Sequence, residues 1–224
     1  MPGLTVHDRT LWPDHPPLLS VDTVEALLSA AQMNTVEFHT WNSTVDRVEQ
    51  PDRVIFDLDP GDGVKWAHVQ EAALLAQTLL GELELKAWLK TSGGKGLHVV
   101  VPLTPSLGYA AVKGFSQAFV RHLTKTIPQR FSATSGPANR IGKVYVDYLR
   151  NGVGQTTAAA FSARARPGMG VSMPVSWEQL LELKSGAHWN VQTAREYLSF
   201  QSVDPWADYW SHEQSLSNAI KRLK

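Results

Sequence analysis

Two carboxylates, Asp57 and Asp59, stand at the end of a segment in which apolar and polar side chains alternate. Alternation over residues 53–62 predicts a β-strand, with both carboxylates on one face and apolar side chains on the other. Such side chains are about 7 Å apart, so the two charges repel unless a cation, best a divalent metal, lies between them. The pair therefore indicates a metal site, although an Asp-x-Asp segment can also cap a turn or a following helix.

A glycine-rich turn between two further predicted strands, residues 85–90 and 97–102, is the second chemical motif. Its glycines allow the backbone to approach a ligand and to direct N–H groups at an anion, while Lys95 adds a positive charge. Glycine follows Lys95, so the segment is not a Walker A motif. The alternative is an ordinary hairpin turn with a solvated lysine. His98 lies on the second of these strands.

A third carboxylate, Asp147, interrupts the apolar strand predicted for residues 144–149. An acid in such a setting is unfavourable unless it is paired or bound to metal. Two or three carboxylates can hold a pair of divalent cations about 3.5–4 Å apart. Phosphate groups would be held by Ser92, Lys95, Arg164 and Arg166, with help from the backbone N–H groups of the glycine loop. This set predicts phosphoryl or nucleotidyl transfer, because that chemistry depends on positioning and charge neutralisation.

The elements that position these residues follow from hydrophobic periodicity. We expect an α/β fold with a twisted, largely antiparallel sheet flanked by helices. Asp22 and Glu25 suggest a capping box for the first helix, and Gly81 suits the C-terminal cap of the second. We expect residues 1–19 to be extended or loop-like. We expect helices over 20–33, 66–80 and 109–127, strands over 35–41 and 158–166, and short helices after 177. The aromatic residues of the C-terminal part are expected in the core, namely Trp189, Tyr197, Phe200, Trp206, Tyr209 and Trp210.

Composition excludes several classes of protein. The 224 residues are 43% hydrophobic and 19% charged, which is typical of a globular chain that can bury a core. No cysteine is present, which excludes disulfides and thiolate metal sites and favours a cytosolic protein. The formal net charge is zero and the apolar runs are short, so neither a strongly basic surface nor a membrane span is expected.

Three segments, in order, resemble the motifs of the archaeo-eukaryotic primase superfamily: Phe56–Pro60, Ser92–His98 and Val146–Asn151. The polymerase (primase-polymerase) domain of bacterial ATP-dependent DNA ligase D is the most similar, and Glu37–His39 and Phe161–Gly168 extend the likeness. The resemblance implies an RRM-like catalytic core and a template-dependent nucleotidyltransferase that extends DNA ends in non-homologous end joining. It also implies manganese or magnesium at Asp57, Asp59 and Asp147. Nucleotide-binding or supporting roles carry over to His39, Ser92, Lys95, His98, Arg150, Arg164 and Arg166.

The expected partners are NTP or dNTP, DNA ends in the form of a primer-template, and end-joining factors such as Ku and a ligase, with no membrane. Such an enzyme would be cytoplasmic, in a bacterium, and associated with the nucleoid. We expect one primase-polymerase-like domain over residues 1–224, in which residues 1–19 are a stub of a shortened N-terminal lobe that could reduce polymerase activity.

Two other functions remain open. The chain could be a weakly active or inactive module that binds nucleotide or DNA in a repair complex. It could also be a different Asp-x-Asp enzyme, either a phosphatase with an aspartate nucleophile or a sugar-nucleotide transferase.

Overall fold

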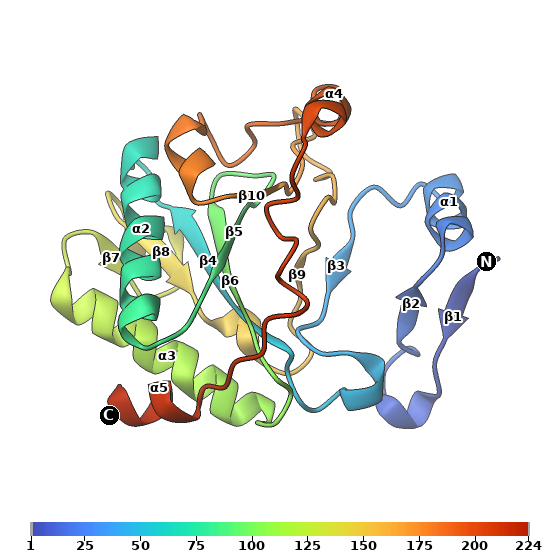
Figure 1. Ribbon diagram of the computed structural model, residues 1–224, viewed down its shortest axis with the longest axis horizontal. Coiled ribbons are helices and arrows are strands. Elements are labelled where there is room, and N and C mark those ends of the chain that lie inside the picture. The colour runs from blue at the N-terminus through green and yellow to red at the C-terminus, as the bar shows by residue number, and fades with distance from the viewer. Residues whose placement is uncertain (1, 224) are drawn as a thin grey trace. The chain divides into compact units, whose positions relative to one another are not determined.

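A computed structural model describes residues 2–223, which form two compact units that divide between Phe38 and His39 (Figure 1). In the first unit, strand β1 (Leu4–Val6) pairs antiparallel with β2 (Leu19–Val21), and helix α1 (Val24–Gln32) follows. The stretch expected to be extended or loop-like over residues 1–19 is extended near both ends, where Leu4–Val6 and Leu19–Val21 form a hairpin.

Helix α1 differs from expectation at its cap, and its large apolar side chains lie on the exposed face. Thr23, and not Asp22, is the N-cap, and its hydroxyl accepts from the Ala26 N–H at 3.1 Å. Val24 and Leu28 are 68% and 61% exposed, while the small face with Ala26 and Ala30 is buried. The reason is a close approach of backbones, since a Cβ on Gly3 would lie 2.6 Å from the Ala26 nitrogen. Only small side chains fit such a contact.

The second unit is built on a six-stranded sheet in the order β10-β5-β6-β4-β8-β7. All neighbours are antiparallel except β7 and β8, which confirms the α/β class with a mainly antiparallel sheet. The strands are β4 (Arg53–Pro60), β5 (Trp88–Thr91), β6 (Leu97–Pro102), β7 (Phe131–Ser132), β8 (Val144–Asp147) and β10 (Pro174–Val175). A separate antiparallel pair joins β3 (His39–Thr40) to β9 (Thr157–Ala158), so the strands expected over 35–41 and 158–166 are much shorter.

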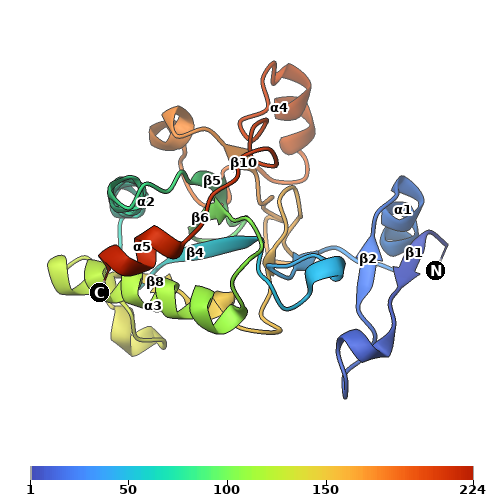
Figure 2. The ribbon, with the colours of Figure 1, turned by 60° about the horizontal axis from the view of Figure 1, so that its bottom comes forward.

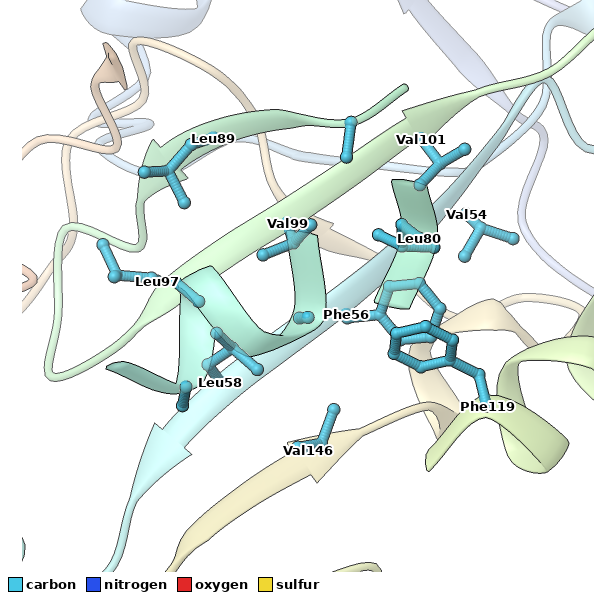
Figure 3. Close-up of a cluster of buried hydrophobic side chains, with 14 of the residues drawn as sticks. Val54, Phe56, Leu58, Leu80, Leu89, Leu97, Val99, Val101, Phe119 and Val146 are labelled. Carbon is cyan, nitrogen blue, oxygen red and sulfur yellow. The ribbon is translucent and has the colours of Figure 1, made fainter. Parts of the chain in front are cut away.

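Helices α2 (Trp66–Glu82) and α3 (Tyr109–Thr126) lie together on one side of this sheet (Figure 2). Their apolar faces pack on the side chains of β4 that alternate with the carboxylates, as expected. Phe56 is fully buried and its ring lies 4.4 Å from that of Phe119 on α3, measured between centroids (Figure 3). Each such buried side chain contributes about 1.5–3 kcal/mol relative to exposure. The opposite face of the sheet carries the ionisable residues and a second, smaller apolar cluster of Ile55, Trp88, Val100 and Tyr209.

The end of α2 corrects a second capping expectation. Gly81 is the penultimate residue of the helix, and the left-handed position is taken by Glu84, with φ of 61°. Backbone hydrogen bonds from Glu84 to Gly81 and from Leu85 to Leu80, both 2.9 Å, close the helix. The cap predicted at Gly81 therefore lies three residues before the left-handed residue, Glu84, that ends the helix.

The C-terminal part contains two short helices, α4 (Ala194–Phe200) and α5 (Ser217–Arg222). Trp189 and Tyr209 are buried as expected, but Phe200 and Trp210 are 82% and 79% exposed, so the core assignment is wrong for these two. Among the described helices, none has the length and apolar character needed to cross a membrane.

Candidate functional site

A single row of ionisable side chains crosses four strands on the face opposite α2 and α3. Lys90 on β5 is the cross-strand partner of His98 on β6, His98 is the partner of Asp57 on β4, and Asp57 is the partner of Asp147 on β8. Directly opposed residues of antiparallel strands point to the same side of a sheet. The register therefore places two of the three expected acids and the expected histidine side by side.

Lys90 is the residue of this row that the sequence analysis did not single out. Its side chain is buried, and Nζ lies 2.8 Å from His98 Nδ1, 2.9 Å from the Ala158 carbonyl oxygen and 2.6 Å from Ser172 Oγ. Burial lowers the pKa of Lys90 to about 7, an effect that Arg164 adds to and the Asp57 carboxylate opposes. The only signal in the sequence is a second lysine in the strand predicted over 85–90, which follows Leu89 and stands just before the glycine loop.

The contact with Lys90 determines how His98 presents its ring. A lysine ammonium only donates, so His98 Nδ1 accepts, and the ring proton is on Nε2. Nε2 lies 3.4 Å from Asp57 Oδ1. Burial lowers the pKa of His98, and the charge of Lys90 lowers it further, so the ring is neutral near neutral pH.

Asp57 and Asp147 have different partners. Burial alone would raise the pKa of Asp57, but the nearby N–H of the His98 ring and the charges of Arg150 and Lys90 hold it below its usual range. Oδ1 of Asp57 is buried without a hydrogen bond among the described residues. Asp147 accepts from the Leu149 N–H at 2.8 Å and from the Tyr145 hydroxyl at 3.3 Å, and its Oδ2 lies 3.1 Å from Arg150 Nε. Asp147 thus caps a turn as well as facing Asp57.

Asp59 lies one step further along β4, at the edge of a charged cavity. Burial raises its pKa to about 6, and repulsion from Asp57 and Asp147 adds to the rise, which Arg140 opposes from 3.3 Å. The cavity has a volume of about 380 Å³. Its lining comprises Asp59, Pro60, Asp62, Lys95, Pro137, Arg140 and Arg166. Arg140 is a second residue of the site that the sequence analysis did not single out.

The glycine loop corrects one expectation. Ser92 Oγ accepts from the backbone N–H groups of Gly94 and Gly96, both at 3.1 Å, so these two donors are directed at Ser92 and not at an external anion. The Ser92 carbonyl accepts from Arg164 at 2.7 Å. Gly96 is required by space, because a Cβ there would lie 2.1 Å from the Leu58 carbonyl oxygen. Ser92 and Arg164 thus shape the loop that carries Lys95.

The expected site residues fall into three groups. Asp57, His98 and Asp147 lie in the row, with Arg150 against Asp147. Asp59, Lys95 and Arg166 line the charged cavity. His39 lies on β3 opposite Ala158, whose carbonyl oxygen accepts from Lys90, so its strand borders the row.

A metal ion would have to compete with the pairs already formed. Within residues 2–223 there is no group of three or more His, Cys, Asp or Glu side chains arranged to hold a metal ion. The acids instead face His98, Arg140 and Arg150. The donor set nevertheless suits a hard divalent cation, since oxygen ligands gather on one face, Oδ1 of Asp57 accepts no hydrogen bond among the described residues, and burial together with repulsion from the other acids raises the pKa of Asp59.

Comparison with known proteins identifies the family. The model of the LigD primase-polymerase domain matches residues 4–206. The chain belongs to this family. It is 48% identical to the multifunctional non-homologous end joining protein LigD of Pseudomonas aeruginosa over 223 residues, which are 99% of this chain and 26% of that protein. It is 26% identical to the bifunctional non-homologous end joining protein LigD of Bacillus subtilis over 206 residues, 91% of this chain and 33% of that protein.

A solved structure supports the same assignment. The polymerase domain from Mycobacterium tuberculosis ligase D in complex with DNA is similar with a TM-score of 0.71 and 26% identity, over 80% of this chain and 64% of that one. The LigD-family chain described here spans only about a quarter to a third of the length of the two curated relatives.

Lys90→Met should release His98 from its fixed tautomer, because methionine cannot donate to Nδ1. We expect the ¹⁵N resonances of His98, measured in histidine-labelled protein near pH 6, to change from a pattern with protonated Nε2 alone to one in which both tautomers are populated. Lys125→Met, at an exposed position on α3, is the control. Unchanged His98 resonances in Lys90→Met would show that another group selects the tautomer.

Asp59 should make the protein less stable as pH rises from about 4 to 6. Its folded pKa of about 6 exceeds the ordinary value of 3.8, so the folded state binds more protons in this range and the free energy of unfolding falls with pH. Asp59→Asn should therefore raise the melting temperature in metal-free buffer, and more so at about pH 7.5 than at about pH 4.5. Asp62→Asn, at an exposed carboxylate of the same cavity, serves as control. An equal shift at both pH values would contradict the assignment.

Proposed function

We propose that this LigD-family chain is a metal-dependent nucleotidyltransferase that extends DNA ends with NTPs in non-homologous end joining. The observation that supports this function best is the sheet register, which brings carboxylates from β4 and β8 together beside a cavity lined by Lys95, Arg140 and Arg166. Nucleotidyl transfer requires such a combination, because the reacting phosphates carry charge that must be neutralised and held in place.

Asp57, Asp59 and Asp147 are the proposed ligands of Mn²⁺ or Mg²⁺. When bound, a divalent cation at these oxygens would stabilise charge on the transferred phosphate and activate the attacking hydroxyl. Arg140 and Arg150 hold the Asp59 and Asp147 carboxylates in orientation from one side. Neutral His98 presents an N–H donor beside Asp57, so it can donate to a phosphate oxygen without adding a charge.

The charged cavity is proposed to hold the triphosphate of the incoming nucleotide. Its volume of about 380 Å³ and its three cationic side chains, Lys95, Arg140 and Arg166, suit a compact polyanion. In the proposed reaction, a DNA 3′-hydroxyl oxygen bonds to the α-phosphorus and the bond from that phosphorus to the bridging oxygen breaks. Pyrophosphate leaves with the electron pair of that bond, and the hydroxyl proton passes to water.

The partners follow from the family and are proposals for this chain. The substrates are NTP or dNTP and a primer-template DNA end, and Ku and a ligase are candidate partners. We propose a primase-polymerase-like domain in a cytoplasmic, nucleoid-associated protein. Structural support for a DNA partner comes from the similar solved domain, which is in complex with DNA.

A catalytically weak module that binds nucleotide or DNA is the second candidate function. The ion pairs formed by Asp59 and Asp147 favour it, because a metal must displace or share those partners. One assay distinguishes the two functions. Only a nucleotidyltransferase would extend a primer-template in the presence of Mn²⁺.

Asp57→Asn and Asp147→Asn should each reduce Mn²⁺-dependent nucleotide incorporation by at least about 100-fold, since each removes a charge that the metal needs. The same variants should lose the rise in melting temperature that Mn²⁺ gives the unaltered protein. Asp46→Asn, at an exposed carboxylate outside the row and outside the lining of the charged cavity, is the control for both measurements. Near-normal incorporation in either row variant would remove that residue from the metal site.

Lys95→Ala and Arg166→Ala should each weaken NTP binding by about 10- to 100-fold, because hydrogen bonds to charged groups contribute about 1.5–3 kcal/mol. Binding is measured by titration of a fluorescent NTP in the presence of Mn²⁺. Lys125→Ala controls for a general loss of positive charge. Unaltered affinity in both cavity variants would assign the triphosphate to another surface.

A further inference from the structure

A second cavity lies on the same face of the sheet, on the other side of the acidic row. It has a volume of about 360 Å³ and is lined mainly by apolar atoms, with Ile55, Val100 and Lys90 at the sheet. Ile55 is the cross-strand partner of Val100 and lies two residues before Asp57 on β4. Side chains two residues apart on a strand are about 7 Å apart, so this cavity is one row from the acids.

Aromatic side chains from two distant segments complete the cavity. Trp206, Tyr209 and Trp210 come from the segment between α4 and α5, which crosses the sheet near β5 and β6 (Figure 1). Trp206 donates its indole N–H to the Leu89 carbonyl at 2.9 Å and stacks on Tyr209 with 4.6 Å between ring centroids. Phe161 follows β9. The cavity is therefore fixed in place by contacts of its own wall with the sheet.

Two of these rings, those of Trp210 and Phe161, are largely exposed, so packing in the core does not account for their positions. Trp210 is 79% exposed and contacts Tyr209 edge-on at 4.9 Å, and Phe161 is 53% exposed. Phe161 has φ of +64°, a left-handed conformation that is costly for a bulky residue, and its N–H donates to the Ser172 carbonyl at 2.7 Å. Exposed aromatic faces beside a cavity are the surfaces on which nucleobases stack.

The charges of the lining are close to balanced. Arg53 and Lys90 are the basic members of the described lining and Asp204 is the acidic one. Arg53 Nε lies 2.9 Å from Asp52 Oδ1, and burial lowers the pKa of Lys90 to about 7. The aromatic rings, and not a surplus of charge, are therefore what suits this cavity to a nucleotide.

The geometry of the proposed reaction indicates which substrate the cavity beside Ile55 would bind. Along β4 the order is the aromatic cavity at Ile55, the acidic row at Asp57, and the charged cavity at Asp59. In phosphoryl transfer the attacking and leaving oxygens lie on opposite sides of the phosphorus. Pyrophosphate that leaves toward Lys95 requires the attacking 3′-hydroxyl to approach from the side of Ile55.

We propose that the cavity beside Ile55 binds the 3′-terminal nucleotide of the DNA strand that is extended, with its base against Trp210 and Phe161. The proposal rests on the proposed function, because that function defines the direction of attack. The hydroxyl oxygen of this nucleotide bonds to the α-phosphorus, pyrophosphate departs on the opposite side, and the hydroxyl proton goes to water. Trp210 thus has a role that the core assignment did not give it.

The test is a binding measurement that needs neither metal nor catalysis. A primer-template with 2-aminopurine at the 3′-terminal position of the primer is titrated with protein, and stacking should quench its fluorescence. Trp210→Ala should abolish most of the quench and weaken binding by about 5- to 150-fold, the range that corresponds to about 1–3 kcal/mol per stacked base. Phe161→Leu is the second variant, and both are checked for an unchanged melting temperature.

Phe200→Ala is the matched control, since Phe200 is 82% exposed and lies outside this cavity. A primer with 2-aminopurine at its 5′ end controls for quenching elsewhere on the protein. Normal quenching and affinity in both Trp210→Ala and Phe161→Leu would overturn the proposal. A loss of affinity for fluorescent NTP in place of the oligonucleotide would also overturn it, because the cavity would then belong to the incoming nucleotide. Quenching without Mn²⁺-dependent extension would instead refute the polymerase function and leave this site standing.

Discussion

Burial of charge on a sheet face is the constraint on which the rest of the structure depends. Lys90 and His98 are 3% and 2% exposed, Asp147 is 7% exposed, and Asp57 lies between them. Such groups are tolerated only when they are paired and hydrogen-bonded. Here the pairing is supplied by the strand register itself, with Ala158 and Ser172 satisfying the remaining donors of Lys90. A slip of one residue in any of these strands would turn part of the row into the apolar core.

The Asn151 side chain forms hydrogen bonds with backbone groups of β4 that have no neighbouring strand. Strand β8 ends at Asp147, so the backbone of Ile55 on β4 has no strand neighbour on that side. The Asn151 side chain takes the place of one, accepting from the Ile55 N–H at 2.9 Å and donating to the Ile55 carbonyl at 2.8 Å. Because the chain can then leave the sheet, the turn Leu149–Asn151 brings Arg150 back against Asp147. One buried amide thereby supports both the sheet and the orientation of a site carboxylate.

The sequence allowed prediction of the elements with strong periodicity and of the acids they carry. Strand β4, strand β6 and helices α2 and α3 lie within a few residues of expectation, because alternation and helical spacing are local properties. The strand register could not be predicted from the sequence, because it depends on contacts between segments far apart in the chain. Lys90 shows the consequence: its role is determined by Ala158 and Ser172, which no local pattern connects to it. The exposed face of α1 and the exposed Trp210 were missed for a related reason, because hydrophobicity indicates that a residue can be buried but not what would cover it.

The partners of Lys90 also set a condition on when the site can exist. Ser172 comes long after β4, β5 and β6 in the chain. During synthesis on a ribosome, these three strands therefore emerge while Lys90 still lacks one of its acceptors. Non-local contacts of this kind form late in folding. A nascent or partly folded chain would therefore display the acids without their ordered neighbours. The ordered row of ionisable side chains exists only after the polypeptide has closed on itself, which ties assembly of the site to completion of the fold.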